Sequence, residues 1–467
     1  MRDVYIIGAH TLKFGKYPDL TIKNLTAEVV QGVLADAGIG KHDLQSVFFS
    51  NAAWGMQNYQ HCIRGQVALR PLGIDTIPIT NVENACASAS TALHGAFKDV
   101  AGGFCDISLA VGVEKLVQPN RFAVFAGFLA ATDVSEILNE AKRLQSNLVP
   151  AEGAASGGES KPKKTTSLTD RVRGRARDLR DQAVVGVQLG EAIGYDTLRQ
   201  LVKFGGGDRS PFMDIYAYAA REHMRKYGST PRQLAIIASK NHWHSSMNPN
   251  AQYTFEVSPE EVLADRIVAP PLTRSMCAPI GDGAAAAIVV SEDVVRRLGL
   301  QKRAVKIRAS ILGSGQARGP DDADIGQRVS AIAYAAAGVG PKDISLVELH
   351  DATAFGEMHQ TEALGFFPKG EGGINAERGV TRIGGKLPVN TSGGLLSRGH
   401  PIGASGLAQI HELVVQLRGE AGKRQVANAK LGLAENGGGA VGVEEAAMCV
   451  HILEAPSAKM AGKGQRG

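Results

Sequence analysis

The strongest constraint on the fold is the alternation of short apolar segments with segments of helical periodicity. Residues 107–113 form a nearly continuous apolar run, which is typical of a strand buried on both faces of a sheet. In residues 21–37 the apolar side chains recur instead at helical spacing, through Ile22, Leu25 and Val29. Strands that alternate with helices in this way predict an α/β protein with a mostly buried sheet.

The same alternation extends along both halves of the chain. Strands are predicted at residues 4–8, 47–49, 76–82, 107–113, 235–239, 284–290, 305–311, 344–349 and 447–453. Helices are predicted at residues 21–37, 86–100, 214–227, 324–337 and 407–417. Two halves of similar architecture are therefore expected, although no repeat is visible in the sequence itself.

The middle of the chain has a different composition. Residues 151–169 are mainly Gly, Ser, Ala, Lys, Pro and Thr, which cannot bury enough apolar surface to become ordered. Lysine and arginine are concentrated between Lys161 and Arg180, which overlaps the end of this segment. The predicted domains are an N-terminal half at 1–118 completed by 231–295, an insertion at 119–230 with a flexible basic part at about 151–180, a C-terminal half at 296–455 and a disordered tail at 456–467.

Composition excludes several classes of protein. The chain is 44% hydrophobic and 21% charged, as is usual for a globular enzyme, and it lacks the run of about 18 apolar residues that a membrane span needs. The net charge of +5 is too small to indicate nucleic-acid binding. Five irregularly spaced cysteines without CxxC pairs fit neither a disulfide framework nor a metal site. We expect a cytoplasmic protein with no bound metal and neither membrane nor nucleic-acid partners.

Three reactive side chains lie beside small-residue or glycine-rich turns. Cys86 follows a predicted strand and opens a helix, whose N-terminal amides favour a thiolate. His350 ends a predicted strand, and ligands of open α/β sheets bind beyond the carboxyl ends of strands. His400 lies between two glycine-rich segments, where backbone and ligand can approach closely. The pattern predicts a nucleophilic thiol with two histidines that move protons and stabilise an oxyanion.

These segments together resemble those of a known superfamily. The motifs NACAS at 84–88, GHPIGASG at 399–406 and NGGG at 436–439 are similar to the nucleophile, GHP and C-terminal glycine loops of thiolases. The segments at 239–249, 282–286 and 350–352 resemble those of sterol-carrier-protein-type and archaeal acetoacetyl-CoA thiolases. The resemblance covers nearly the whole chain except about 131–210. It implies a five-layered αβαβα fold of two similar halves, with a loop domain inserted in the first.

The resemblance also implies a role for each residue. Cys86 attacks an acyl-CoA to form an acyl-enzyme, which splits one acyl transfer into two easier steps. His400 takes the thiol proton, and His350 helps to hold the enolate or thioester oxygen. The backbone N–H groups of Cys86 and Gly438 form a second oxyanion hole. No cofactor is permanently bound, coenzyme A thioesters are the substrates, and CoA contacts are expected at His242, Ser392 and Gly393.

The chain departs from this pattern at the second catalytic cysteine. Thiolases carry that cysteine either in a C-terminal Cys-x-Gly loop, where residues 434–439 contain none, or after the His-Asp pair, where this chain has Ala352. Glu435 is a candidate substitute, because a desolvated carboxylate can act as a base. Alternatively Asn436 occupies the position and Glu435 is solvated. Cys277 is expected to be a packing residue.

Three functions stay open on this reading. The first is a thiolase-type acyl-CoA C-acyltransferase that cleaves or forms a 3-oxoacyl-CoA. The second is a condensing enzyme, because Cys-His-His is also the ketosynthase pattern and a Glu435 base would approach that of hydroxymethylglutaryl-CoA synthase. The third is a thiolase-like subunit that works only with a small zinc-ribbon/OB-fold protein. The resemblance implies a homodimer or a dimer of dimers. The sequence does not indicate which acyl chain the protein prefers or in which direction the reaction runs.

Overall fold

The protein is described here by a computed structural model that covers residues 2–118, 124, 128–135, 209–319, 322–442 and 444–457. The chain divides into two compact units, Gln118–Pro211 and a main unit of Met1–Val117 with Phe212–Gly467. The predicted insertion extended to residue 230, whereas residues 212–230 belong to the main unit. The predicted flexible segment at 151–180 and residues 458–467 of the predicted tail lie outside the described residues.

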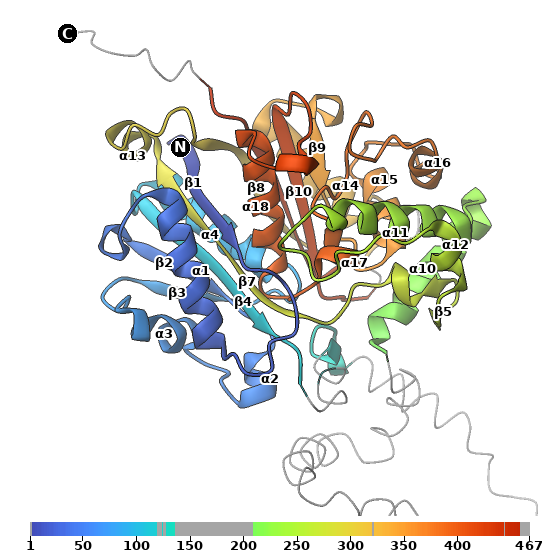
Figure 1. Cartoon of the computed structure of the whole chain (residues 1–467), viewed down its shortest axis with the longest axis horizontal. Helices are drawn as coiled ribbons and strands as arrows, with labels where there is room; N and C mark the ends of the chain where they lie inside the picture. The colour runs from blue at the N-terminus through green and yellow to red at the C-terminus, as the bar shows by residue number, and fades with distance from the viewer. Residues whose placement is uncertain are drawn as a thin grey trace, which may run out of the picture. The chain divides into compact units, whose positions relative to one another are not determined.

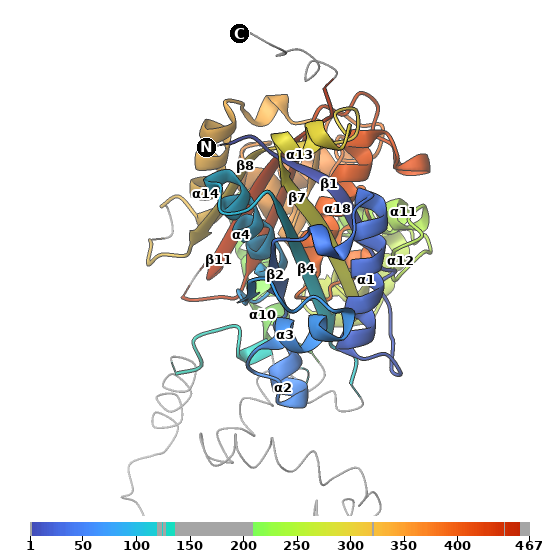
Figure 2. The same cartoon turned by 90° about the vertical axis from the view of Figure 1, so that its left-hand side faces the viewer.

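The described part of the main unit contains a nine-stranded mixed sheet with the order β3-β2-β4-β7-β1-β8-β11-β10-β9 (Figures 1 and 2). Its strands are β1 (Val4–Thr11), β2 (Ser46–Ser50), β3 (Ile79–Val82), β4 (Ile107–Lys115), β7 (Asp282–Ser291), β8 (Val305–Ser314), β9 (Leu346–Glu348), β10 (Leu431–Gly438) and β11 (Ala447–Glu454). A separate pair consists of β5 (Ile267–Ala269) and β6 (Leu272–Thr273).

The two halves of the sheet repeat the same arrangement. In the first half β2 lies parallel between β3 and β4, and β7 runs antiparallel to both β4 and β1. In the second half β9 is parallel to β10, and β11 runs antiparallel to both β10 and β8. A parallel bridge from Val347 to Val389 takes the place of β3. The halves meet where Tyr5 and Ile6 of β1 pair with β8.

Each of the five predicted helices is present among those described, and the other helices were not predicted. Those described are α1 (Ile22–Ala37), α2 (Trp54–Asn58), α3 (Arg64–Leu69), α4 (Ser88–Gly102), α10 (Pro211–Tyr227), α11 (Pro231–Ser246), α12 (Pro259–Ala264), α13 (Glu292–Arg297), α14 (Ile325–Ala337), α15 (Ala354–Ala363), α16 (Gly372–Glu377), α17 (Gly394–Arg398) and α18 (Ser405–Arg418). None of the described helices is long and apolar enough to cross a bilayer.

The strand predicted at 235–239 is wrong, because these residues lie inside α11. Short apolar runs do not distinguish a buried strand from a buried helix. Here the start of the helix decides the outcome. The Thr230 side chain accepts a hydrogen bond from the Gln233 N–H, and Pro231 occupies the first turn.

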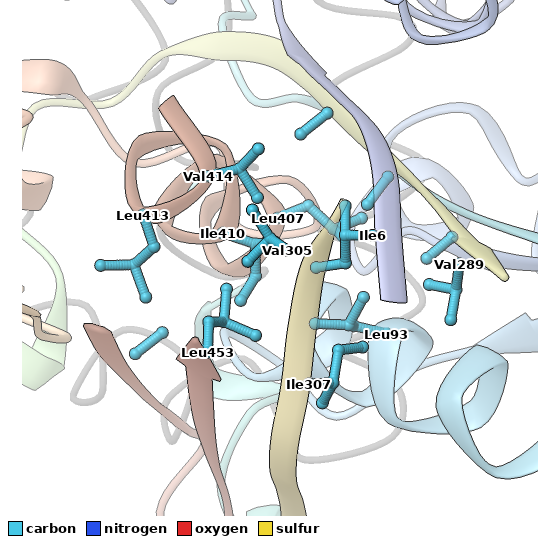
Figure 3. Packing of buried hydrophobic residues seen from close by; sticks show 14 of the residues in the cluster. Ile6, Leu93, Val289, Val305, Ile307, Leu407, Ile410, Leu413, Val414 and Leu453 are labelled. Carbon is cyan, nitrogen blue, oxygen red and sulfur yellow. The ribbon is translucent and has the colours of Figure 1, made fainter. Parts of the chain in front are cut away.

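Three apolar cores separate the layers of the main unit. Helix α1 packs on the outer face of the first half, and α14 packs on the outer face of the second. Helices α4 and α18 share the core between the halves, where Leu93 and Leu407 meet strand residues such as Val289 and Leu453 (Figure 3). The order helix, sheet, helix, sheet, helix is the predicted αβαβα arrangement. The two central helices begin beside the predicted catalytic residues.

Candidate active site

Cys86 lies in a tight turn between β3 and α4. Ala85 has a positive φ of 47°, which is uncommon for a residue with a side chain. Two hydrogen bonds hold the turn: the Ala87 N–H donates to the Asn84 carbonyl at 2.9 Å, and the Ser88 hydroxyl donates to the Ala85 carbonyl at 2.6 Å. The turn thereby places the thiol at the start of a central helix.

One ring nitrogen of His400, Nε2, is placed to accept a hydrogen bond from the Cys86 thiol. The Ser405 hydroxyl donates to the Pro401 carbonyl at 3.0 Å, so its oxygen is left to accept from Nδ1 of His400, 2.7 Å away. The ring proton is therefore on Nδ1, and Nε2 is unprotonated. Nε2 lies 3.3 Å from the Cys86 sulfur. His400 is thus in place to take the thiol proton.

His350 has the opposite tautomer. The Ser90 hydroxyl donates to Oδ1 of Asn436 at 2.9 Å, and Nδ2 of Asn436 lies 2.9 Å from Nδ1 of His350. Because Nδ1 accepts, the ring proton is on Nε2. Burial lowers the pKa of His350 to about 4, so the ring is neutral near pH 7. His350 therefore offers an uncharged N–H donor for an oxyanion.

The structure brings the three predicted residues together. One ligand atom each from Cys86, His350 and His400 lies within 4.8 Å of the others. The two imidazole rings have centroids 5.1 Å apart and an interplanar angle of 86°. An acceptor for the thiol proton and a donor for an oxygen atom thus face the same nucleophile.

The resting thiol is not a thiolate, contrary to the expectation from its helix terminus. Burial raises the pKa of Cys86 to about 12, and the charges of Glu114 and Glu83 raise it further. The backbone N–H groups of Gly439 and of Cys86 itself lower the pKa, but they do not outweigh burial. The thiol therefore needs a nearby base as it reacts, and Nε2 of His400 lies in position for that role.

The backbone donor beside the sulfur is one residue beyond the predicted one. Gly438 is the last residue of β10 and pairs with Ala447, whereas Gly439 has left the strand with φ of 67° and directs its N–H to Cys86. Gly438 has another function. A Cβ there would lie 2.3 Å from the Asn84 oxygen and 2.4 Å from the Ala87 nitrogen, so only glycine lets β10 approach the nucleophile turn.

The pleat of β10 separates Glu435 from Asn436. Successive side chains of a strand point to opposite faces, and Asn436 faces α4 and the catalytic cluster. Glu435 accepts from the backbone N–H of His350 at 3.0 Å through Oε2. Asn436, not Glu435, therefore occupies the position beside the nucleophile, and its amide has no acidic proton to transfer. Glu435 is fully buried and not solvated.

The predicted CoA contacts are all buried. The ring of His242 stacks with the rings of Tyr253 and Phe255. Its Nδ1 lies 3.1 Å from the Ser397 hydroxyl. The Ser392 hydroxyl donates to Glu348 at 2.6 Å. Gly393 has φ of 100° and packs against α11. These residues have packing roles here, and their contact with CoA stays a prediction.

Sequence reasoning missed two residues that support the site. Ser405, inside the GHP motif, sets the tautomer of His400. Glu114, the carboxylate that follows the apolar run 107–113, accepts the N–H of Gly403 at 3.2 Å and that of Ala52 at 2.9 Å. Burial raises the pKa of Glu114 to about 7. The signal that could have identified Glu114 is its position, a carboxylate at the end of a buried strand.

Replacing Asn436 by alanine is expected to lower kcat by about 10- to 100-fold, because His350 loses the partner that keeps its proton on Nε2. KM should change much less, since the amide supports a group that acts in the transition state. Steady-state kinetics on a 3-oxoacyl-CoA measure both constants. Ser46→Ala, which removes a buried hydroxyl bonded to Ser108 outside the site, is the control. An unchanged kcat for Asn436→Ala would contradict the assignment.

The comparisons with known families agree with this fold. Residues 4–133 match the family described as thiolase, N-terminal domain, and residues 323–454 match thiolase C-terminal domain-like. The chain therefore belongs to the thiolase family and is an acyltransferase of that type. Acetyl-CoA acetyltransferase of Methanothermobacter thermautotrophicus is 37% identical over 459 residues, which cover 97% of this chain and 100% of that protein.

More distant relatives fit the same family. Sterol carrier protein 2 of Oryctolagus cuniculus is 33% identical over 489 residues, covering 99% of this chain and 76% of that protein. Among solved structures, one described as an Ltp2-ChsH2(DUF35) aldolase superposes with a TM-score of 0.66 at 20% identity, covering 98% of this chain and 99% of that chain. At 20% identity, this likeness shows that the two proteins share a fold.

Proposed function

We propose that this thiolase-family acyltransferase cleaves or forms a 3-oxoacyl-CoA through an acyl-Cys86 intermediate. The observation that carries the proposal is the set of tautomers around Cys86. A hydrogen-bond acceptor, Nε2 of His400, faces the thiol. His350 has its proton on Nε2, the nitrogen that Asn436 leaves free. This division of roles suits attack by a thiol on a carbonyl carbon followed by stabilisation of an enolate.

In the cleavage direction, Cys86 gives its proton to Nε2 of His400 and its sulfur bonds to C3 of the 3-oxoacyl-CoA. The oxygen on C3 takes the negative charge and is held by the backbone N–H groups of Cys86 and Gly439, which already face the sulfur. The C2–C3 bond then breaks. Its electron pair forms the enolate of acetyl-CoA, and the acyl group stays on Cys86 as a thioester.

His400 supplies the proton that a second cysteine supplies in the family pattern. The enolate oxygen accepts a hydrogen bond from Nε2 of His350, and the adjacent His400 imidazolium gives its proton to C2 of the enolate. Acetyl-CoA leaves. Free CoA then gives its thiol proton to His400 and attacks the thioester carbonyl, and Cys86 departs as a thiolate that recovers the proton. Every proton is accounted for without another side chain.

Intact-mass measurement tests the proposal. The purified chain is mixed with acetyl-CoA and with a panel of 3-oxoacyl-CoAs of different chain length. We expect a mass gain equal to one acyl group, which is absent in Cys86→Ala and present in Cys277→Ala, whose thiol donates to the Thr273 carbonyl outside the site. The best-labelling chain identifies the preferred acyl group. An adduct that persists in Cys86→Ala, or no adduct with any substrate, would contradict an acyl-Cys86 intermediate.

A second candidate function is condensation by decarboxylation. The other four cysteines of the chain, Cys62, Cys105, Cys277 and Cys449, lie outside the group formed by Cys86, His350 and His400. Malonyl-CoA loses CO2 to give the enolate of acetyl-CoA, so no base has to remove a proton from C2. Release of labelled CO2 from malonyl-CoA by the acylated protein, faster than thiolysis of any 3-oxoacyl-CoA, would favour this function.

The proposal also includes the proteins with which this chain assembles. A solved structure of similar fold is described as an Ltp2-ChsH2(DUF35) aldolase, a title that names a second component. By analogy, this chain works with a small accessory protein, such as a zinc-ribbon/OB-fold protein, for full activity. The resemblance to thiolases further suggests a homodimer or a dimer of dimers. Light scattering on the purified chain measures its mass in solution. Full turnover by the isolated chain would contradict the need for an accessory protein.

A further inference from the structure

Two carboxyl groups, the buried Glu435 and the half-buried Glu445, lie on the far side of β10 from Cys86. Glu435 extends from β10, and Glu445 comes from the segment just before β11. Both reach the space over Gly437, where a Cβ would lie 3.5 Å from Oε1 of Glu435 and 3.6 Å from Oε1 of Glu445. The missing side chain of Gly437 therefore leaves a gap that the two carboxyl groups share.

The oxygens of Glu435 have different surroundings. Oε2 accepts from the backbone N–H of His350 at 3.0 Å. Oε1 is buried and makes no hydrogen bond of normal geometry among the described residues, although the backbone N–H of Gly437 also favours the charged carboxylate. A buried charged oxygen without a partner is unfavourable, whereas a protonated Oε1 could donate across the gap, directly or through a water. The arrangement is that of a carboxylic acid with one accepting and one donating oxygen.

We infer that Glu435 acts as a protonated, neutral carboxyl group that positions His350, and that its burial together with Glu445 across Gly437 keeps it in that form. The role rests on the proposed function, in which His350 holds an enolate oxygen. A neutral acceptor fixes the His350 main chain without placing a negative charge beside the oxyanion that develops there. Glu435 is thus a positioning residue and not the base that replaces the second cysteine.

The titration of Glu435 agrees with this role. Burial, followed by the charge of Glu445, raises the pKa of Glu435 to about 8, although the N–H groups of His350 and Gly437 favour the charged form. Two carboxylates in one buried space do not both ionise readily. The other titratable groups nearby are Cys449 on β11 and Tyr216 on α10, whose own pKa values are raised mainly by burial and further by Glu435.

Burial raises the pKa of Glu445 above its ordinary value too, although several neighbours favour its charged form. Gln360 of α15 donates to its Oε1 at 3.2 Å, and His359 lowers its pKa. Burial, Asp324 and Glu444 raise the pKa of Glu445, and Glu444 is itself paired with Arg318 and Arg328. Glu445 is partly exposed, so it ionises more readily than Glu435.

Conservative substitution separates a neutral acid from a base. Glu435→Gln keeps an oxygen for the His350 N–H and an N–H for the gap, whereas Glu435→Leu keeps neither. We expect Glu435→Gln to acylate Cys86 at least about tenfold faster than Glu435→Leu at pH 7, because Leu leaves the His350 N–H unsatisfied. Equal rates for the two variants, or a slower rate for Gln, would overturn the inference.

A direct titration does not depend on turnover. In infrared difference spectra of wild type against Glu435→Gln, a carboxylic-acid carbonyl band should be present at pH 6 and disappear as the pH rises through about 8. In Glu445→Gln the band should disappear at a lower pH, because the charge that opposes ionisation is gone. Absence of the band at pH 6, or no shift in Glu445→Gln, would contradict the role. If acyl transfer fails while the band titrates as expected, the proposed function fails and the acid pair remains.

Discussion

Replacing His400 by glutamine is expected to slow acylation of Cys86 by about 10³-fold or more. Glutamine can accept a hydrogen bond from the thiol but cannot take its proton. The need for a base is large here, because burial raises the pKa of Cys86 to about 12. At pH 7 the thiolate is therefore scarce unless Nε2 of His400, 3.3 Å away, removes the proton.

Two measurements check this expectation. Single-turnover mass spectrometry gives the rate of acyl transfer, and alkylation by iodoacetamide reports the reactivity of the thiol without any substrate recognition. Both rates should fall in His400→Gln. His94→Gln is the matched control, since His94 is a half-buried histidine of α4 whose ring bonds to Ser310 at 3.1 Å. Acylation at the wild-type rate in His400→Gln would mean that another group deprotonates Cys86.

The pH profile of acylation follows from the same geometry. Burial, with smaller contributions from the charges of His350 and Arg398, holds the pKa of His400 well below 6.5. A base works in its unprotonated form, so the rate should not begin to fall until the pH is well below 6.5. A rate that falls near pH 6.5 would instead indicate a solvated imidazole.

Replacing Gly438 by alanine is expected to reduce both stability and acylation. The new Cβ would lie 2.3 Å from the Asn84 oxygen and 2.4 Å from the Ala87 nitrogen. Both are backbone atoms of the nucleophile turn, so a rotamer change cannot relieve the contact. Overpacking of this kind costs about 1–3 kcal/mol of unfolding free energy. Displacing Cys86 by about 1 Å also lowers the acylation rate by about 10²-fold.

Thermal or denaturant unfolding and single-turnover acylation measure these two effects separately. Gly340→Ala is the matched control, because its Cβ would come no nearer than 3.9 Å to another group and its φ of −127° suits alanine. We expect the control to be unchanged in both measurements. Wild-type acylation by Gly438→Ala would show that β10 need not approach the nucleophile turn so closely.

The candidate catalytic residues could be chosen from local sequence. Cys86, His350 and His400 each lie in a short motif whose small residues permit close approach, and each follows or precedes an element that periodicity predicts well. Their mutual proximity is a property of the repeated topology. Cys86 precedes α4 and His400 precedes α18, and these two helices pack against each other in the central layer. The αβαβα order was available from the resemblance.

Other features depended on contacts between distant segments. Local sequence placed a strand at 235–239, where the N-terminal cap at Thr230 and packing against α15 and α16 produce a helix. The choice between Glu435 and Asn436 rests on the pleat of β10, since a shift of one residue moves a side chain to the opposite face of the sheet. The backbone donor at Gly439 depends likewise on the residue at which β10 ends.

The sequence by itself determined which groups can react, because side-chain chemistry and short turns are local properties. The charge state of those groups was settled by the folded chain. A helix terminus favours a thiolate, yet the surrounding layers bury Cys86 and raise its pKa, and they bury Glu435 beside Glu445 and raise the pKa of that carboxyl. The desolvation of Cys86 depends on contacts between segments far apart in the sequence, such as that with His400, so it arises only when the two halves pack together.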